Sequence, residues 1–100
     1  MITILDVKPE SDITSLRARI DAVDQQILDL LAERVRIVLE VGEYKRERGL
    51  AVYDPVRERE MLERLCSRAQ VPLDQATVRG VFERLIDESR RLENVHVKRE

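Results

Sequence analysis

Apolar residues recur at three- and four-residue steps along the first half of the chain, which is the spacing of one face of an α-helix. The residues of this stripe are Ile13, Leu16, Ile20, Val23, Ile27, Leu30, Leu31, Val38 and Val41. Ser11 or Asp12 can cap its start, and Gly49 stands where helices commonly stop. The pattern predicts a first helix over about residues 12–48, with Gly42 as a mild cost in its middle.

Two further helices are predicted after this one. Asp54 followed by Pro55 is a start signal, because the acid can cap a helix and proline fits its first position. We expect this second helix over about residues 55–69, with Pro72 marking the break after it. Asp74 can cap a third helix. Its apolar stripe consists of Val78, Val81, Phe82, Leu85, Ile86 and Leu92. The chain is therefore predicted to be all-α, with three helices.

The first predicted helix is too long for one small chain to cover. About 37 residues at 1.5 Å each make a helix of roughly 55 Å, whereas a compact domain of this size has a radius of gyration of about 13 Å. We therefore expect a single domain over residues 1–100, with its core at about 13–94, that pairs with a second copy. The predicted assembly is an intertwined six-helix homodimer. A plain coiled coil is the alternative, but the apolar steps are too irregular for a strict heptad.

Composition excludes several classes of protein. Apolar residues make up 43% of the chain, without the run of about 20 that a membrane helix needs. The first ten residues lack a secretory signal pattern, so we expect a cytoplasmic protein. The single cysteine, Cys66, has no disulfide partner in the chain and no neighbouring ligand residues, so we expect it to pack in a helix and expect no metal site.

Charge argues against a nucleic-acid binder. Charged residues make up 38% of the chain, yet the net charge is only −2 and the arginines are interleaved with glutamates. The aromatic residues, Tyr44, Tyr53 and Phe82, are too few and scattered to form a stacking surface for bases. We therefore expect no nucleic-acid partner.

Two cations of the first predicted helix fall on its apolar side. Arg34 lies 7 residues after Ile27, and Lys45 lies 7 after Val38, so both share the stripe that should be buried. They are roughly 16 Å apart along the helix and nearly in line, so their side chains can converge on a small anion. Arg17 is rotated about 100° from Arg34, which places it toward another face, where a partner's pocket could lie. Any one of these arginines could instead snorkel or pair with a nearby acid.

Two segments of the sequence together resemble the all-α chorismate mutase family. The first is LLAERVRIVLEVGEYK over residues 30–45, and the second is DPVRERE over residues 54–60, nine residues further on. The resemblance extends over about residues 13–94 without a large gap and includes the segment around Arg17. It implies a dimer of three-helix chains with two equivalent sites, and no cofactor.

The resemblance also implies the roles of individual residues. Arg17 would reach a substrate carboxylate in the partner's site, while Arg34 and Arg57 would bind carboxylates within their own chain. Lys45 would contact a carboxylate and the ether oxygen of chorismate. The remaining predicted contacts are those of Glu58 and the Asp54 backbone with the ring hydroxyl, and of Ser89 with a carboxylate.

Position 93 departs from several members of that family, which have glutamine where this chain has Glu93. Only a protonated Glu93 can donate a hydrogen bond to the ether oxygen. Burial would raise its pKa and nearby cations would lower it. We expect the carboxylate to dominate in the empty enzyme at neutral pH, and bound dianionic substrate to restore the proton.

The chemistry agrees with these roles. Rearrangement of chorismate to prephenate is unimolecular and needs no nucleophile, general base or metal, and the only histidine is His96 near the end of the chain. Arginine suits a dicarboxylate because its planar fork binds a carboxylate bidentately. An isochorismate pyruvate lyase is the nearest alternative, disfavoured by Glu58, which related lyases tend to lack. A non-catalytic helical module that binds an effector or a larger synthase is the second alternative.

Overall fold

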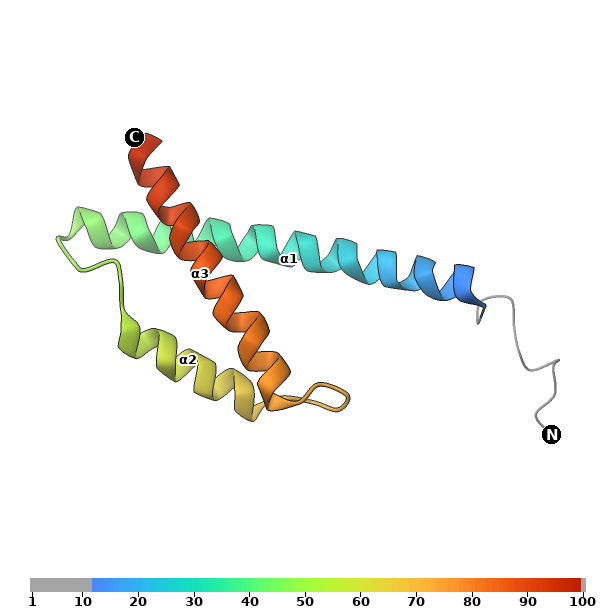
Figure 1. Ribbon diagram of the computed structural model, residues 1–100. Helices are drawn as coiled ribbons and strands as arrows, with labels where there is room; N and C mark the ends of the chain where they lie inside the picture. The colour runs from blue at the N-terminus through green and yellow to red at the C-terminus, as the bar shows by residue number, and fades with distance from the viewer. Residues whose placement is uncertain (1–11, 100) are drawn as a thin grey trace. The chain divides into compact units, whose positions relative to one another are not determined.

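The computed structural model describes residues 12–99 and contains three helices. They are α1 (Ile13–Glu47), α2 (Pro55–Ser67) and α3 (Gln75–Arg99), with no strand among the described residues (Figure 1). The all-α prediction with one long helix is thus confirmed. Nothing in a single chain tests the predicted dimer.

The ends of α1 agree with the expected signals. The Asp12 carboxylate accepts a hydrogen bond of 2.8 Å from the Ser15 backbone N–H, which caps the helix. Ser11, the other candidate cap, lies outside the described residues. At the far end Gly49 takes a φ of 67°, a left-handed conformation that suits glycine, and the Leu50 N–H closes the turn onto the Lys45 carbonyl at 2.8 Å.

α2 begins where the sequence predicts and ends earlier than predicted. The Asp54 carboxylate accepts from the Arg57 N–H at 3.0 Å, and Pro55 is the first helical residue. The helix stops at Ser67, two residues before the expected end at 69. A tight turn replaces the last residues, because the Arg68 N–H bonds to the Leu65 carbonyl at 3.0 Å and the Ser67 hydroxyl donates to the Arg64 carbonyl at 2.7 Å.

α3 is capped as predicted and packs beside α2. The Asp74 carboxylate accepts from the Thr77 N–H at 2.8 Å. The two helices lie side by side (Figure 1) and bury a small apolar core between them, to which Cys66, Val78 and Ile86 contribute. This is the packing role expected for the cysteine.

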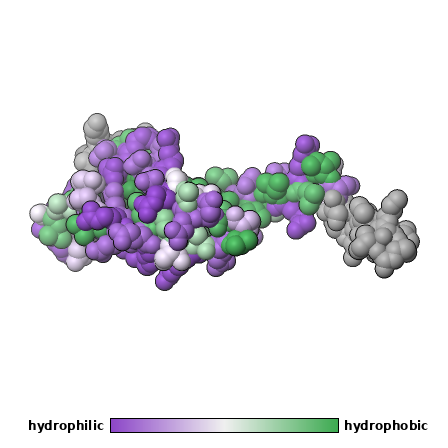
Figure 2. Space-filling view, turned by 60° about the horizontal axis from the view of Figure 1, so that its bottom comes forward, coloured by the Kyte–Doolittle hydropathy of each residue, from purple (hydrophilic) through white to green (hydrophobic). Residues whose placement is uncertain are grey.

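The described chain falls into two compact units whose boundary lies between Arg34 and Val35. The first unit contains the N-terminal part of α1, and its apolar side chains face solvent in a single chain. Ile20, Val23 and Leu30 are 59%, 52% and 64% exposed, and Figure 2 shows such apolar side chains in green on the surface of this part of α1. The predicted single domain over residues 1–100 stays a prediction.

The second unit contains the rest of α1 together with α2 and α3. Within it, α3 passes the C-terminal part of α1, where His96 Nε2 lies 3.0 Å from Glu43 Oε1. Over the described residues, no helix is both long enough and apolar enough to cross a membrane.

Candidate active site

Each helix of the second unit supplies one predicted residue to a cluster of charged side chains. Lys45 comes from the end of α1, Glu58 from the first turn of α2, and Glu93 from α3. All three are half-buried. Lys45 and Glu58 are close enough to Glu93 for their charges to act on its pKa. The structure thus places two of the other seven predicted site residues, Lys45 and Glu58, near Glu93.

Gly42 makes room for the Glu93 carboxylate. It is the buried residue of α1, and a Cβ built on it would lie 2.8 Å from Glu93 Oε2, closer than such contacts normally occur. The same Cβ would lie 3.4 Å from Nη1 of Arg46. In the sequence, Gly42 is only a residue that lowers helix stability. In the structure, its missing side chain leaves room for the Glu93 carboxylate of α3 beside α1.

The surroundings of Glu93 raise its pKa above the ordinary value for glutamate. Burial, the largest influence, raises its pKa above the ordinary value for glutamate, and the negative charge of Glu58 adds to this. Lys45, Arg46 and Arg90 act in the opposite direction but do not cancel it. Burial therefore outweighs the cations, so Glu93 keeps its proton to a higher pH than an exposed glutamate does.

Lys45 is held at the turn between α1 and α2. Its ammonium group donates a hydrogen bond of 3.3 Å to the Val52 carbonyl, and its own carbonyl accepts from Leu50. One such bond uses one of the three donors of an ammonium group. The side chain is therefore oriented by the loop and can still bind an anion.

Sequence reasoning did not predict the partner of Glu58. Arg90 of α3 places one guanidinium nitrogen, Nη2, at 2.6 Å and 2.7 Å from the two Glu58 carboxylate oxygens. The same guanidinium carbon lies 4.8 Å from the centre of the Tyr53 ring, which is a cation–π distance. A usable signal was present, because Arg90 follows Ile86 by four residues and therefore continues the apolar side of α3.

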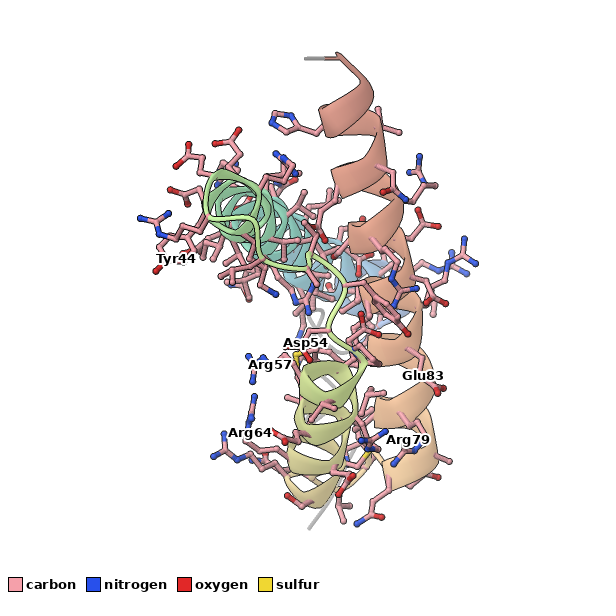
Figure 3. All side chains as sticks on the ribbon, turned by 90° about the vertical axis from the view of Figure 1, so that its left-hand side faces the viewer. Tyr44, Asp54, Arg57, Arg64, Arg79 and Glu83 are labelled. Atoms are coloured by element: carbon pink, nitrogen blue, oxygen red, sulfur yellow. The ribbon has the colours of Figure 1, made fainter. Side chains whose placement is uncertain are left out.

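The other predicted residues of the second unit are Ser89, Asp54 and Arg57. Ser89 is buried on α3, one turn before Glu93. The Asp54 side chain caps α2, and Arg57 is exposed; Figure 3 shows Arg57 on the side of α2 that points away from α3. The Arg57 side chain is therefore accessible from solvent.

Arg17 and Arg34 belong to the first unit. Arg17 is exposed and Arg34 is half-buried. Their expected roles, in the partner's site and in the chain's own site respectively, stay predictions.

A groove of about 410 Å³ lies between α2 and α3 and is not suited to a dicarboxylate. It is lined by Glu58, Leu62, Glu83, Ile86 and Asp87. Figure 3 shows Glu83 on α3. Three carboxylates line this groove, so it would repel an anion, whereas Lys45, Arg46 and Arg90 surround Glu93. An anionic substrate is better matched to the cationic cluster.

The described residues contain no group of three acidic, cysteine or histidine side chains that could hold a metal ion. Cys66 is buried, with its sulfur 3.7 Å from the Gln75 carbonyl oxygen.

The fold and the site together define an all-α protein of the chorismate mutase class. Residues 16–94 match the family described as chorismate mutase type II, so the chain belongs to that family, as its sequence motifs implied. The solved chorismate mutase of Thermus thermophilus (form II) superposes with a TM-score of 0.79 at 41% identity, covering 82% of this chain and 93% of that one. The Helicobacter pylori chorismate mutase, solved in complex with prephenate, superposes with a TM-score of 0.78 at 34% identity, covering 86% and 93%.

Relatives of two different lengths are similar in sequence to this chain. The chorismate mutase of Methanocaldococcus jannaschii is 30% identical over 89 residues, which is 86% of this chain and 88% of the relative. The T-protein of Enterobacter agglomerans is 42% identical over 87 residues, which is 84% of this chain but 23% of the relative. The chain thus spans about a quarter of the length of the first curated relatives it matches.

Proposed function

We propose that this chain catalyses the rearrangement of chorismate to prephenate. The observation that carries the proposal is that Lys45, Glu58 and Glu93, from three different helices, lie close enough for their charges to interact, inside the segment that matches the chorismate mutase family. A cation, an acceptor carboxylate and a carboxyl group with a raised pKa are the groups this reaction can use.

Catalysis is proposed to be geometric and electrostatic. Chorismate is a dianion whose side chain must lie over its ring before bonds can exchange. Arg34 and Arg57 are proposed to bind its two carboxylates, with Ser89 as an additional contact, because arginine binds a carboxylate through two parallel hydrogen bonds. Binding both carboxylates restricts the flexible substrate to its reactive conformer.

Two further groups are proposed to stabilise the transition state. As the C–O bond breaks, negative charge develops on the ether oxygen, where Lys45 and a protonated Glu93 can donate hydrogen bonds. The upward shift of the Glu93 pKa supports this role. Glu58, together with the Asp54 backbone, is proposed to accept a hydrogen bond from the ring hydroxyl group of chorismate.

We also propose that the chain works as an intertwined six-helix homodimer in which Arg17 completes the partner's site. The exposed apolar side chains of α1 support this, since leaving residues such as Val23 and Leu30 in water is unfavourable and a second copy could cover them. A single domain over residues 1–100 and a cytoplasmic location remain part of the proposal.

The test is to mix the purified chain with chorismate and with isochorismate in separate reactions, and to follow prephenate, pyruvate and salicylate. Prephenate from chorismate is the expected result. Pyruvate and salicylate from isochorismate, without prephenate from chorismate, would instead assign the chain to the lyases.

A further inference from the structure

We propose that Arg90 is a positioning residue that holds the Glu58 carboxylate in the orientation needed to accept the substrate hydroxyl. This inference rests on the function proposed above and extends it to a residue that the sequence motifs do not include. Arg90 acts through Glu58 and is not proposed to touch the substrate.

The geometry of the pair supports a fixed acceptor. Nη2 of Arg90 reaches both oxygens of Glu58, at 2.6 Å and 2.7 Å, so rotation of the carboxylate would break at least one hydrogen bond. These are short, charge-assisted bonds. Each carboxylate oxygen has two acceptor positions, so one on each oxygen is still available for a hydroxyl group.

Arg90 is itself held from other directions. The Tyr53 ring lies against its guanidinium group at 4.8 Å, and Nη1 approaches Asp87 Oδ1 at 3.5 Å. Its Nε is buried and finds no hydrogen-bond partner among the described residues. The Glu58 carboxylate raises the pKa of Arg90 further above its usual high value, so the guanidinium is charged throughout the working range of pH.

The pair differs from the ion pairs that Arg84 and Arg91 make within α3. Arg84 and Arg91 bind Glu88 within a single helix, at 2.8 Å and 2.7 Å, and their side chains are 77% and 61% exposed. The pair of Arg90 and Glu58 instead joins α3 to α2 across 32 residues of sequence, with 39% and 26% of the side chains exposed. A bond between two helices can fix a site, whereas exposed pairs within one helix contribute little.

Charge gives a second reason for an arginine at this position. Glu58 raises the pKa of Glu93 and Arg90 lowers it, so Arg90 offsets the negative charge that Glu58 adds to the cluster. A site for a dianion can hold two acidic side chains only if cations accompany them. Arg90 supplies such a cation, so Lys45 does not have to pair with Glu58.

The test is a double-mutant cycle with Arg90→Met, Glu58→Gln and the double variant, measuring kcat and KM for chorismate. We expect Arg90→Met to lower kcat/KM about tenfold in the parent and less than about twofold in the Glu58→Gln background, since the two groups act as a unit. Arg90→Lys should recover part of the loss. Arg91→Met, the matched control from the neighbouring exposed pair, should leave both constants unchanged.

Equal losses from Arg90→Met in both backgrounds would show that Arg90 does not act through Glu58, and an Arg90→Met variant with parental constants would show that it has no role. If circular dichroism finds Arg90→Met unfolded, Arg90→Lys in the two backgrounds takes its place with the same criteria. A parent chain that makes no prephenate would contradict the proposed function and the role of Arg90 together, whereas an active parent with additive losses would contradict the role of Arg90 alone.

Discussion

At the scale of single residues, Glu93 has the surroundings with the clearest chemical consequence. Burial raises its pKa against the opposing charges of Lys45, Arg46 and Arg90. A raised pKa means that the protonated form persists to higher pH than in a free glutamate, and that it is lost as pH rises through the shifted value. The proposed ether-oxygen donor should therefore be present on the acidic side of that value.

We predict that activity rises as pH falls below about 7, because more of Glu93 then carries its proton. Glu93→Gln, a permanent donor of the same shape, should flatten the profile and match or exceed the parent at about pH 8. The measurement is kcat/KM from about pH 5 to about pH 9 for both proteins. Glu88→Gln, on the same helix, is the control and should retain the parental profile. Parallel profiles for parent and Glu93→Gln would show that Glu93 is not the donor.

The sequence points to a candidate site residue where a polar group interrupts an apolar stripe. Lys45 could be identified in this way, and the family resemblance added Glu58 and Glu93. Arg46 and Gly42 could not be identified from the sequence. Arg46 is there an ordinary cation at a helix end, and Gly42 is a glycine that lowers the stability of its helix slightly. Their contacts with the Glu93 region depend on how α3 passes α1, which no local pattern encodes.

At the scale of elements, the start of α2 connects stability to the site. The Asp54 cap fixes the first turn of α2, and that turn carries both Arg57 and Glu58. The start of each helix could be predicted from its capping residue. The end of α2 could not, because it is set by hydrogen bonds of Ser67 and Arg68 that compete with the helical pattern.

We predict that Asp54→Ala destabilises the chain by about 1 kcal/mol, the usual cost of losing a capping side chain. It should also raise KM for chorismate, since the turn that holds Glu58 would fray. Asp54→Asn keeps a capping oxygen and should behave like the parent. Thermal unfolding and steady-state kinetics provide both measurements.

Asp74→Ala is the matched control, because it removes the corresponding cap from α3, far from Glu93 along the helix. It should lower the melting temperature without raising KM. If the two alanine variants changed KM alike, the effect of Asp54 would be general destabilisation and not a local change at the site.

At the scale of the whole molecule, much of the apolar stripe of α1 is exposed in a single chain, which supports the proposed pairing with a second copy. Among the described residues, the buried apolar side chains are those of Cys66, Val78 and Ile86, while much of the first unit's stripe is exposed. The sequence predicted this imbalance from the length of the first helix. It could not predict the relation between the two units, because that depends on contacts between distant parts of the molecule.

We predict that Arg17 acts across the dimer. Arg17→Ala and Lys45→Ala chains should each be inactive alone, but subunit exchange should restore one complete site per heterodimer, because one chain supplies Lys45 and the other Arg17. Mixing Arg34→Ala with Lys45→Ala is the control and should restore nothing, since both residues are proposed for the site of their own chain. Verified heterodimers of Arg17→Ala and Lys45→Ala without activity would contradict the dimer arrangement.

The central claim is tested most directly by the turnover of chorismate to prephenate by the parent chain and by Lys45→Ala. The parent should form prephenate, and the variant should lose about two to three orders of magnitude in kcat, the cost of about 3 to 4 kcal/mol for one preorganised group at a developing charge. Its helical content should be unchanged, because the Lys45 ammonium group bonds to the Val52 carbonyl of the loop and supports no part of the apolar core. A Lys45→Ala variant that retains more than about a tenth of parental turnover would contradict the proposed site.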